Sequence, residues 1–221
     1  MKAIFCLITL ALGSNLALAQ ADTASTAADT DAETAVPQRP VHFYLGGGLA
    51  YGGDDLVRLE YTDGETGKIK AGSGITLDAG VLWTPPNSDL QLQFTYGIQS
   101  DSDSAENADI SFDRERMELL AFYQIRENHR LGFGFSKHMD IQFDYDFAGE
   151  RYKLNYEDAT GIVLEWDFFS HIHTNSIVSI GLRFVNIHYE PESQYLWNGY
   201  TLYEQEKLDG SHFAVVFGIA L

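Results

Sequence analysis

From residue 41 onward, apolar and polar residues alternate along the chain in a series of short segments. In residues 90–99 every second residue is apolar, and the residues between them are Gln, Thr and Gly. A period of two places the apolar residues on one face of a β-strand, whereas a helix would scatter them around its circumference. The alternation predicts eight strands, over residues 41–51, 73–84, 90–100, 114–125, 129–139, 155–168, 176–188 and 211–221.

The connections between the predicted strands alternate in length. Short ones at residues 85–89, 126–128 and 169–175 follow the second, fourth and sixth strands. The other gaps are longer and hold most of the acidic residues. This alternation is typical of an antiparallel barrel that has short turns at one end and long loops at the other. The chain is therefore predicted to be all-β, an eight-stranded antiparallel up-and-down transmembrane barrel over residues 41–221.

The residues on the polar faces favour a transmembrane barrel over a soluble, lipocalin-like one. A soluble barrel shows its polar face to water, whereas a membrane barrel encloses that face. Here the polar faces are rich in Gly and Gln, such as Gly97, Gln91 and Gln93, which fit the crowded interior of an eight-stranded barrel. Strands of about 10 residues suffice for a tilted crossing, and backbone hydrogen bonding in lipid requires the last strand to pair with the first.

The charged residues on the polar faces come in both signs. Because an unpaired buried charge is costly, residues that face inward need partners of opposite sign. We predict an ion-pair network that plugs the lumen; the alternative for any one of these residues is a place at a rim, in water. The members are Arg114, Arg116, Arg130 and Arg183 with Asp78, Glu118, Glu165 and Asp167.

Four aromatic residues lie on the outward faces shortly before the short turns. Aromatic side chains at this height form the interfacial girdle of membrane proteins. The alternative explanation is the ordinary preference of aromatic residues for strands. The predicted girdle consists of Trp83, Tyr123, Trp166 and Phe168.

Residues 1–19 have the pattern of a cleaved signal peptide. Lys2 supplies a positive charge, residues 4–12 are apolar, and residues 17–19 form a small-x-small cleavage site. The alternative is a buried N-terminal helix. Residues 20–40 are rich in Ala, Asp and Thr, a composition that predicts a flexible tail, in the periplasm if the chain is exported.

Composition narrows the possible classes of protein. The chain has 14 Lys and Arg against 32 Asp and Glu, a net charge of -18 that argues against a nucleic-acid partner. One cysteine, Cys6, excludes a disulfide framework and a Cys-rich zinc site. The mean hydropathy of -0.16 suits a soluble acidic protein, yet a membrane barrel also averages low because only every second residue meets lipid. No cofactor is predicted.

The expected signal, the eight alternating segments, the acidic loops and a last strand that ends at Leu221 resemble the small outer-membrane β-barrels of Gram-negative bacteria. The nearest groups are the OmpA, OmpX and OmpW types, whose members usually end in Phe or Trp. The resemblance implies an outer-membrane location, with both termini and the short turns in the periplasm and the long loops outside. It implies a monomer whose partners are outer-membrane lipid, lipopolysaccharide and the barrel-assembly machinery.

The 100–109 segment, read as a loop, groups acidic residues that could bind calcium or magnesium weakly. It lacks the central Gly and the bidentate Glu of an EF-hand, and a solvated acidic loop is the alternative. Together with the 140–158 loop it could hold divalent ions that bridge lipopolysaccharide. The candidate ligands are Asp101, Asp103, Glu106 and Asp109.

The positions of histidine and serine give little support to an enzyme. Ser211 and His212 are adjacent, so they fall on opposite faces of a strand, and Ser136 and His138 share a face predicted to lie inside. We therefore expect a non-enzymatic barrel with a structural or surface-contact role in the cell envelope. The alternatives are a small channel for apolar or small solutes, in the manner of the OmpW type, and a lipid A deacylase or acyltransferase.

Overall fold

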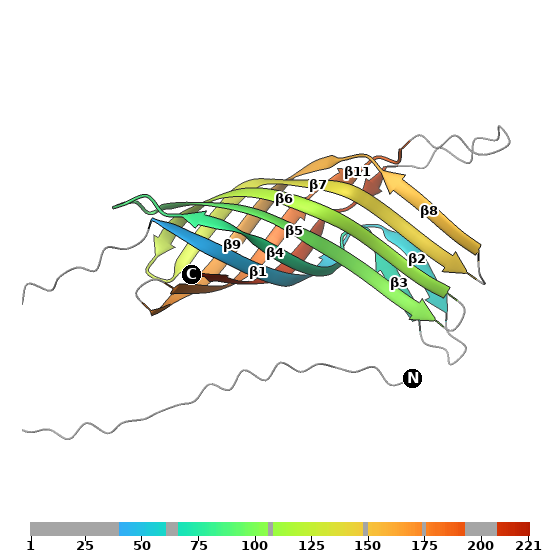
Figure 1. Ribbon diagram of the computed structural model, residues 1–221, viewed down its shortest axis with the longest axis horizontal. Helices are drawn as coiled ribbons and strands as arrows, with labels where there is room; N and C mark the ends of the chain where they lie inside the picture. The colour runs from blue at the N-terminus through green and yellow to red at the C-terminus, as the bar shows by residue number, and fades with distance from the viewer. Residues whose placement is uncertain (1–39, 61–65, 106–107, 148–149, 174–175, 193–206) are drawn as a thin grey trace, which may run out of the picture. The chain divides into compact units, whose positions relative to one another are not determined.

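Eight antiparallel strands close into a barrel in the computed structural model (Figure 1). The structure describes residues 40–60, 66–105, 108–147, 150–173, 176–192 and 207–221, so the expected signal peptide and nearly all of the tail lie outside the described residues. The closed antiparallel barrel confirms the predicted fold class. Its strands, in order around the barrel, are β1 (Val41–Gly52), β4 (Gly74–Trp83), β5 (Leu90–Ala105), β6 (Ala108–Arg126), β7 (His129–Phe147), β9 (Ala159–His173), β10 (Ser176–Asn186) and β13 (His212–Ala220).

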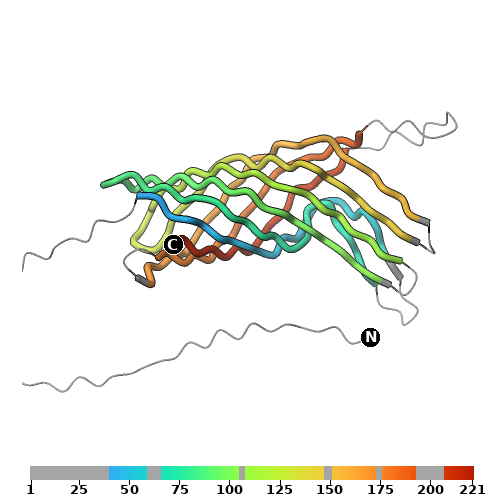
Figure 2. The backbone as a smooth tube through the Cα atoms, viewed as in Figure 1, coloured from blue at the N-terminus to red at the C-terminus, as the bar shows by residue number. Residues whose placement is uncertain are grey.

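The barrel closes where β1 meets β13. The register runs from Tyr44 opposite Ala220 to Gly52 opposite His212. Beyond it, the Phe43 N–H donates to the Leu221 carbonyl at 3.1 Å and the Leu221 N–H returns a bond to Phe43 at 2.9 Å. Figure 2 shows the start of β1 and the end of β13 at the same end of the barrel, here called the short-turn end. The opposite end, where the longer connections lie, is called the long-loop end.

Three strands extend farther toward the long-loop end than the sequence predicts. β5, β6 and β7 contain 16, 19 and 19 residues, and β8 (Glu150–Tyr156) pairs with the upper part of β7. The acidic 100–109 segment and the 140–158 segment were both expected to be loops. Residues 100–105 and 108–109, and most of the described residues of 140–158, are instead strands of a four-stranded sheet that continues past the other barrel strands (Figure 1). The prediction of loops was wrong because residues 100–104 contain no apolar residue, and because on β6 the apolar residues move to the inner face at this height.

Two short hairpins occupy the long-loop end. One consists of β2 (Asp55–Glu60) and β3 (Thr66–Lys70), and the other of β11 (His188–Tyr189) and β12 (Leu208–Asp209). They are joined by reciprocal bonds of 2.8 Å, since the Asp54 N–H donates to the Asp209 carbonyl and the Asp209 N–H donates to the Asp54 carboxylate. The connections after β1 and β10 thus hold each other over the barrel mouth.

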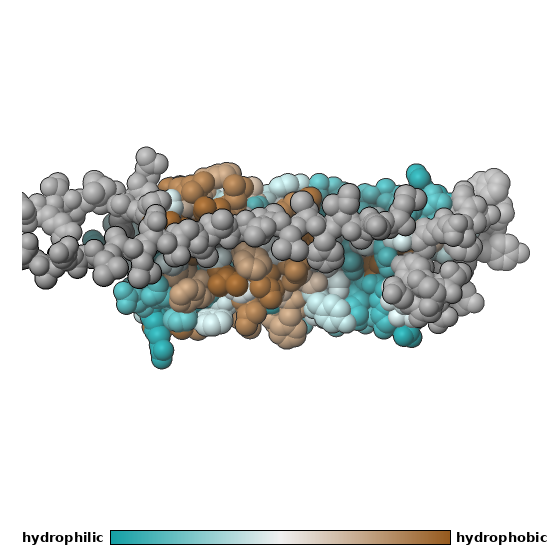
Figure 3. Space-filling model, turned by 90° about the horizontal axis from the view of Figure 1, so that it is seen from below, coloured by the Kyte–Doolittle hydropathy of each residue, from teal (hydrophilic) through white to brown (hydrophobic). Residues whose placement is uncertain are grey.

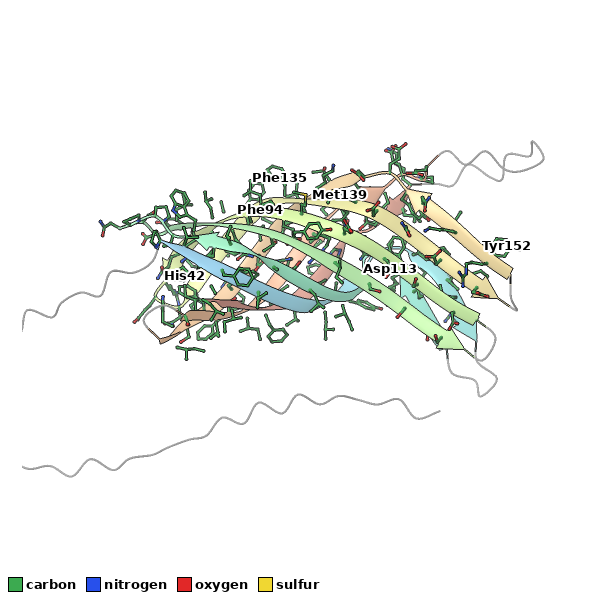
Figure 4. All side chains as sticks on the ribbon, in the orientation of Figure 1. His42, Phe94, Asp113, Phe135, Met139 and Tyr152 are labelled. Carbon is green, nitrogen blue, oxygen red and sulfur yellow. The ribbon has the colours of Figure 1, made fainter. Side chains whose placement is uncertain are left out.

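Large apolar side chains form a band around the outer face of the barrel. Leu49, Ile75 and Leu119 are each more than half exposed, and Phe135 points away from the barrel in Figure 4. Figure 3 shows the band in brown, with hydrophilic surface in teal at both ends. This wall has the reverse polarity of a soluble barrel, whose outer face is polar.

Among the described residues, none forms a helix that is long and apolar enough to cross a membrane.

The character of both faces changes along β6. Toward the long-loop end the outer face carries acids and serine, and from Met117 onward it is apolar. The inner face changes at nearly the same height, from the apolar Ile110 and Phe112 to the buried charges of Arg114 and Arg116. One strand therefore serves an apolar core at one end and an apolar outer wall at the other.

A β-bulge on β7 marks the same height. The pairing of β6 with β7 shifts between Asp113 and Glu115, and Asp140 has a left-handed φ of 45°. Because the bulge adds one residue, the inner face passes from Ser136 and His138 to the odd-numbered positions that follow. Those positions carry apolar side chains, namely Ile141, Phe143 and Tyr145.

Candidate functional site

The candidate site is the lumen, because the charged residues predicted to face inward all lie there and are buried. Glycines on the inner faces of the wall make room for larger neighbours. At Gly46 and Gly218, an added Cβ would lie 2.6 and 2.5 Å from the Tyr44 hydroxyl, so the Tyr44 ring needs both glycines. Tyr44 packs in an apolar cluster at the short-turn end with Leu82, Phe169, Ile177 and Ala220.

Glu118 lies at the centre of the ion-pair network. Its carboxylate accepts from Arg183 at 2.7 Å, from Arg116 at 3.4 Å and from the Ser136 hydroxyl at 3.0 Å. Arg116 also donates to Asp78 at 2.6 Å, and Arg183 donates to Glu165 at 2.5 Å. These residues come from β4, β6, β7, β9 and β10, so the network spans the barrel. Buried charges are tolerated in such a place only when they are paired and hydrogen-bonded.

A second ion pair lies nearer the short-turn end. Arg130 approaches Asp167 at 2.7 Å and donates to the Gln91 side chain at 2.7 Å. The Arg130 guanidinium lies over the Phe122 ring at 4.0 Å and has the Phe169 ring 5.7 Å away. Gly132 is the reason this ring fits, because a Cβ there would meet Phe122 at 2.5 Å. The sequence gives no signal for Gln91 as a partner, since it is 39 residues from Arg130.

Arg114 faces the lumen but takes no part in the ion pairs found among the described residues. It donates one bond, to the Ser73 carbonyl at 3.0 Å. Its guanidinium lies 4.8 Å from the Phe112 ring and 6.0 Å from the Tyr189 ring. Three of the four arginines expected in the network thus form ion pairs, whereas Arg114 lies against aromatic faces and a carbonyl.

Tyr189 closes the lumen at the long-loop end. It is fully buried, its hydroxyl lies 2.8 Å from His138 Nδ1, and its ring packs on Phe112 with centroids 6.0 Å apart. His212 Nδ1 lies 2.8 Å from the Gly210 carbonyl, which supports the same connection. Sequence reasoning missed Tyr189 because it lies in a connection and meets His138 across 51 residues.

An apolar core surrounds Tyr189 and fills the barrel mouth. Ile69 and Ala71, which come from β3 and the turn after it, are buried in this core. Phe112 and Tyr156 meet there edge to face, with ring centroids 6.0 Å apart. The same cluster continues down the lumen wall beside the ion pairs, through Leu120, Phe122, Val163 and Val185. The lumen is thus filled by ion pairs together with apolar side chains, and a separate apolar cluster around Tyr44 lies at the short-turn end.

The four residues of the predicted girdle all lie on the outer face and are exposed. The register places Tyr123 and Trp166 opposite the same residue, Leu131 on β7, and Phe168 opposite His129. The His129 ring stacks on Trp166 with centroids 5.5 Å apart. Trp83 ends β4 at the short-turn end.

The candidate cation ligands are divided between two faces of a hairpin. Asp101 and Asp103 lie on the inner side of β5, whereas Asp109 lies on the outer side of β6, where it accepts from Ser104 at 2.5 Å. Asp101 accepts from the Lys70 N–H at 3.3 Å. Glu106 lies outside the described residues. Within the described ranges, no three His, Cys, Asp or Glu side chains are grouped so that they could hold a metal ion.

The β2–β3 hairpin carries a charge cluster outside the barrel. Asp55 receives Lys70 at 2.6 Å and Lys68 at 2.9 Å. Hydrogen bonds from Lys70 and then from Lys68 lower the pKa of Asp55 to about 2, and the bond to Asp55 raises the pKa of Lys70. On the other hairpin, hydrogen bonding to Ser211 lowers the pKa of Asp209. Both hairpins are thus held partly by charge.

The serine and histidine side chains considered for acyl transfer are hydrogen-bonded to other groups and not to each other. The Ser136 hydroxyl donates to Glu118 and not to His138, whose Nδ1 is occupied by Tyr189. The Ser211 hydroxyl contacts the backbone of Ile187, and His212 points into the lumen. These contacts are structural ones between strands and connections.

A closed barrel of eight strands, with an apolar outer wall and a charged, filled lumen, defines the class of this protein. No protein-family model matches the chain, and no curated protein matches it in sequence. The solved structures that it is similar to are small outer-membrane barrels of eight strands, the group that the sequence pattern resembles.

Three of these structures illustrate the likeness. Neisserial surface protein A has 9% identity and a TM-score of 0.46, over 83% of this chain and 97% of that one. Ail, the attachment invasion locus protein of Yersinia pestis, has 10% identity and a TM-score of 0.44, over 82% and 97%. The outer membrane protein AlkL in DMPC lipid bilayers has 10% identity and a TM-score of 0.40, over 92% and 94%. The likeness concerns the course of the strands alone.

Proposed function

We propose that this protein spans the bacterial outer membrane as a closed, non-conducting barrel. Its role is structural or one of surface contact, carried by the sheet and hairpins at the long-loop end. It reaches the membrane through export with a cleaved signal peptide at residues 1–19, and the barrel-assembly machinery inserts it as a monomer. The short-turn end faces the periplasm, and the long-loop end faces the outside.

The change of polarity along β6 and β7 supports the membrane placement. Below Glu115 the outer face is mainly apolar, with Lys137 beside Met117 at its upper border, and above it the outer face of β6 carries Asp109, Ser111 and Asp113. A strand in water throughout would keep its apolar face inside along its whole length. A strand that leaves lipid partway along must exchange its faces at the lipid surface, as β6 and β7 do.

The filled lumen is the observation that carries the structural role. Ion pairs between Glu118, Arg116 and Arg183 cross the middle, and apolar clusters around Tyr44 and Tyr189 close the two ends. An eight-stranded barrel leaves an interior just wide enough for side chains. A continuous aqueous path would require the network to break, which is unfavourable because it leaves buried charges without their partners.

Single-channel recording tests the closed state. The full-length protein, reconstituted in planar bilayers, is expected to show no steady conductance. A Glu118→Ala, Arg183→Ala double variant, which removes the central pair but leaves the outer wall unchanged, serves as the opened comparison. Steady conductance of the unaltered protein would contradict the proposal and favour the small channel.

The membrane placement and the surface role have separate tests. The protein is expected to require detergent for extraction and to migrate differently on gels before and after heating; extraction into plain buffer would contradict the barrel in lipid.

Protease added to whole cells is expected to cut the β5–β6 hairpin and not the turn after β4. We further propose that the protein has no enzymatic activity, so lipid A mass spectra should be identical with and without it.

A further inference from the structure

Arg114 is the one lumen arginine in the described part of the chain that lacks a carboxylate partner. Arg116 uses Asp78 and Glu118, and Arg183 uses Glu118 and Glu165. Asp167 is taken by Arg130 at 2.7 Å. The lumen carboxylates are therefore all engaged below Arg114, and a positive charge is left at the level of the barrel mouth.

The Arg114 guanidinium has more donors than its surroundings use. Only 2% of the residue is exposed, and one nitrogen, Nη2, donates to Ser73. The Nε and Nη1 atoms have no hydrogen-bond partner among the described residues. Burial of a charged group with unmet donors is strongly unfavourable, so this arrangement calls for an acceptor that carries negative charge.

The groups next to Arg114 add donors and positive charge. Arg116 lies one step down the inner face of β6, its Nε also has no partner among the described residues, and His138 is opposite it on β7. When the Tyr189 hydroxyl donates to His138 Nδ1, the neutral ring carries its proton on Nε2, a further donor without a described partner. Unmet donors of Arg114, Arg116 and His138 thus belong to one region of the lumen.

The two nearby acceptors do not neutralise the charge. The Gln99 Oε1 atom is neutral and has no described partner, and His212 presents an Nε2 lone pair when Nδ1 donates to Gly210. Asp101 is the nearest free-standing carboxylate on this side of β5, but it accepts from the Lys70 N–H and forms no ion pair with Arg114. Asp113, on the outer side of β6, accepts from the Ser100 and Ser111 hydroxyls and likewise forms no ion pair with Arg114. The field of Asp101 and Asp113 reaches Arg114, but neither carboxylate accepts a hydrogen bond from its free donors.

We propose that Arg114, with Arg116 and His138, binds a small inorganic monovalent anion, of the size of chloride, in the upper lumen. The anion balances Arg114 and accepts the unmet donors, while the Phe112 and Tyr189 rings flank the guanidinium and exclude bulk water. This site goes beyond the proposed function: it concerns how the plug is completed, and it does not depend on the surface role or on whether the barrel conducts.

The test compares the full-length protein in sodium chloride and in sodium gluconate of equal ionic strength, since gluconate is too large for such a site. Ligand that binds only the folded state lowers the unfolding equilibrium constant about hundredfold at a concentration of 100 times its Kd. Chloride is expected to raise the unfolding midpoint with a saturating dependence, and Arg114→Met is expected to lose that dependence. Arg58→Met, on the exposed β2–β3 hairpin, is the control and should keep it.

Two further measurements keep the proposal falsifiable if Arg114→Met does not fold. Anomalous scattering from crystals of the unaltered protein grown in bromide should place one bromide beside Arg114. Asp101→Asn, which removes the described inner-face carboxylate that acts on Arg114, should leave the chloride dependence intact or increase it. Equal stability of the unaltered protein in the two salts, no bromide at Arg114, or loss of the chloride effect in Asp101→Asn would each overturn the proposal.

Discussion

The lower and upper halves of β6 differ in what holds them in place. In the lower half the inner face carries Arg116 and Glu118, and the outer face carries Met117 and Leu119. In the upper half the inner face packs Phe112 against Tyr156, and the outer face is polar. The lower inner face also buries Leu120 and Phe122. The same backbone is therefore held by ion pairs and apolar side chains below, and by an apolar core without ion pairs above. The apolar face of β6 is therefore the outer one where the strand would meet lipid and the inner one where it would meet water.

The difference also shows in the neighbours of each half. The lower half pairs along its length with barrel strands on both sides, β5 and β7, whose inner faces are polar or glycine. The upper half belongs to the four-stranded sheet with β8, and its inner face is covered by β3 and the connection that carries Tyr189. The upper part thus has an apolar interior and a polar outside, as in a soluble protein, whereas the barrel below it has an apolar outside.

Breaking the ion-pair half should have the largest effect. Glu118→Leu leaves Arg116 and Arg183 with one carboxylate partner each. The expected loss of unfolding free energy is about 3–5 kcal/mol, measured by urea titration in lipid vesicles. Glu118→Gln, which keeps the shape and accepts hydrogen bonds, is the matched control and should lose less. Equal losses for both variants would show that packing and not charge holds this layer.

A charge on the apolar wall should rank next. Phe94 and Ser102 lie on the outer face of β5, the first in the apolar band and the second above it. Phe94→Arg is expected to destabilise the inserted barrel by about 2–4 kcal/mol, as for Arg near the middle of a bilayer. Ser102→Arg is expected to change stability by less than about 0.5 kcal/mol. Similar costs at both positions would remove the contrast between the halves.

The seal at the barrel mouth should respond more weakly. Tyr189→Phe keeps the ring in the core but removes the bond to His138, whose Nδ1 then has no partner. The expected cost is about 1–3 kcal/mol, with faster hydrogen exchange at the Gly210 N–H, which donates to Ile187. Tyr51→Phe, at an exposed tyrosine of the outer wall, is the control. Unchanged exchange at Gly210 would mean that the ring alone holds the connection.

The smallest effect concerns pH. Bonds from Lys70 and Lys68 lower the pKa of the exposed Asp55 from 3.8 to about 2. A group whose pKa is lower in the folded state stabilises the fold fully above its unfolded pKa, and this contribution is lost as the pH falls through the folded value. The β2–β3 hairpin should therefore loosen between about pH 4 and pH 2. NMR titration of Asp55 checks this, and Lys70→Met should move the pKa of Asp55 back up.

Much of the barrel can be predicted from the alternation alone. Segments 90–100 and 129–139 fall inside β5 and β7, and the inward side of Glu118 follows from its neighbours Met117 and Leu119. This works because a strand surrounded by lipid on one side has a strict period of two. The prediction stops at Glu115, where the outer face becomes polar and the segment looks like a loop.

The residues that complete the lumen could not be predicted in the same way. Tyr189 lies just beyond the predicted 176–188 strand, and Ser73 acts through its backbone carbonyl, which carries no side-chain signal. Their contacts with His138 and Arg114 join positions far apart in the chain. The bulge at Asp140 moves the inner face of β7 by one position, and the sequence around it contains no Gly or Pro that would predict a bulge. Such features depend on the register between strands, which the alternation of one strand does not specify.

The sequence by itself determined the number of barrel strands, their order and the face on which each side chain lies within the predicted alternating segments, because these follow from local periodicity and from the lengths of the turns. The tertiary structure decided which charges meet, leaving Arg114 without a carboxylate while Glu118 receives two arginines. It also decided that the acidic segments continue as strands over an apolar core. The reason is that ion pairs and cores form across the barrel, where the closure and stagger of the strands set the distances between side chains.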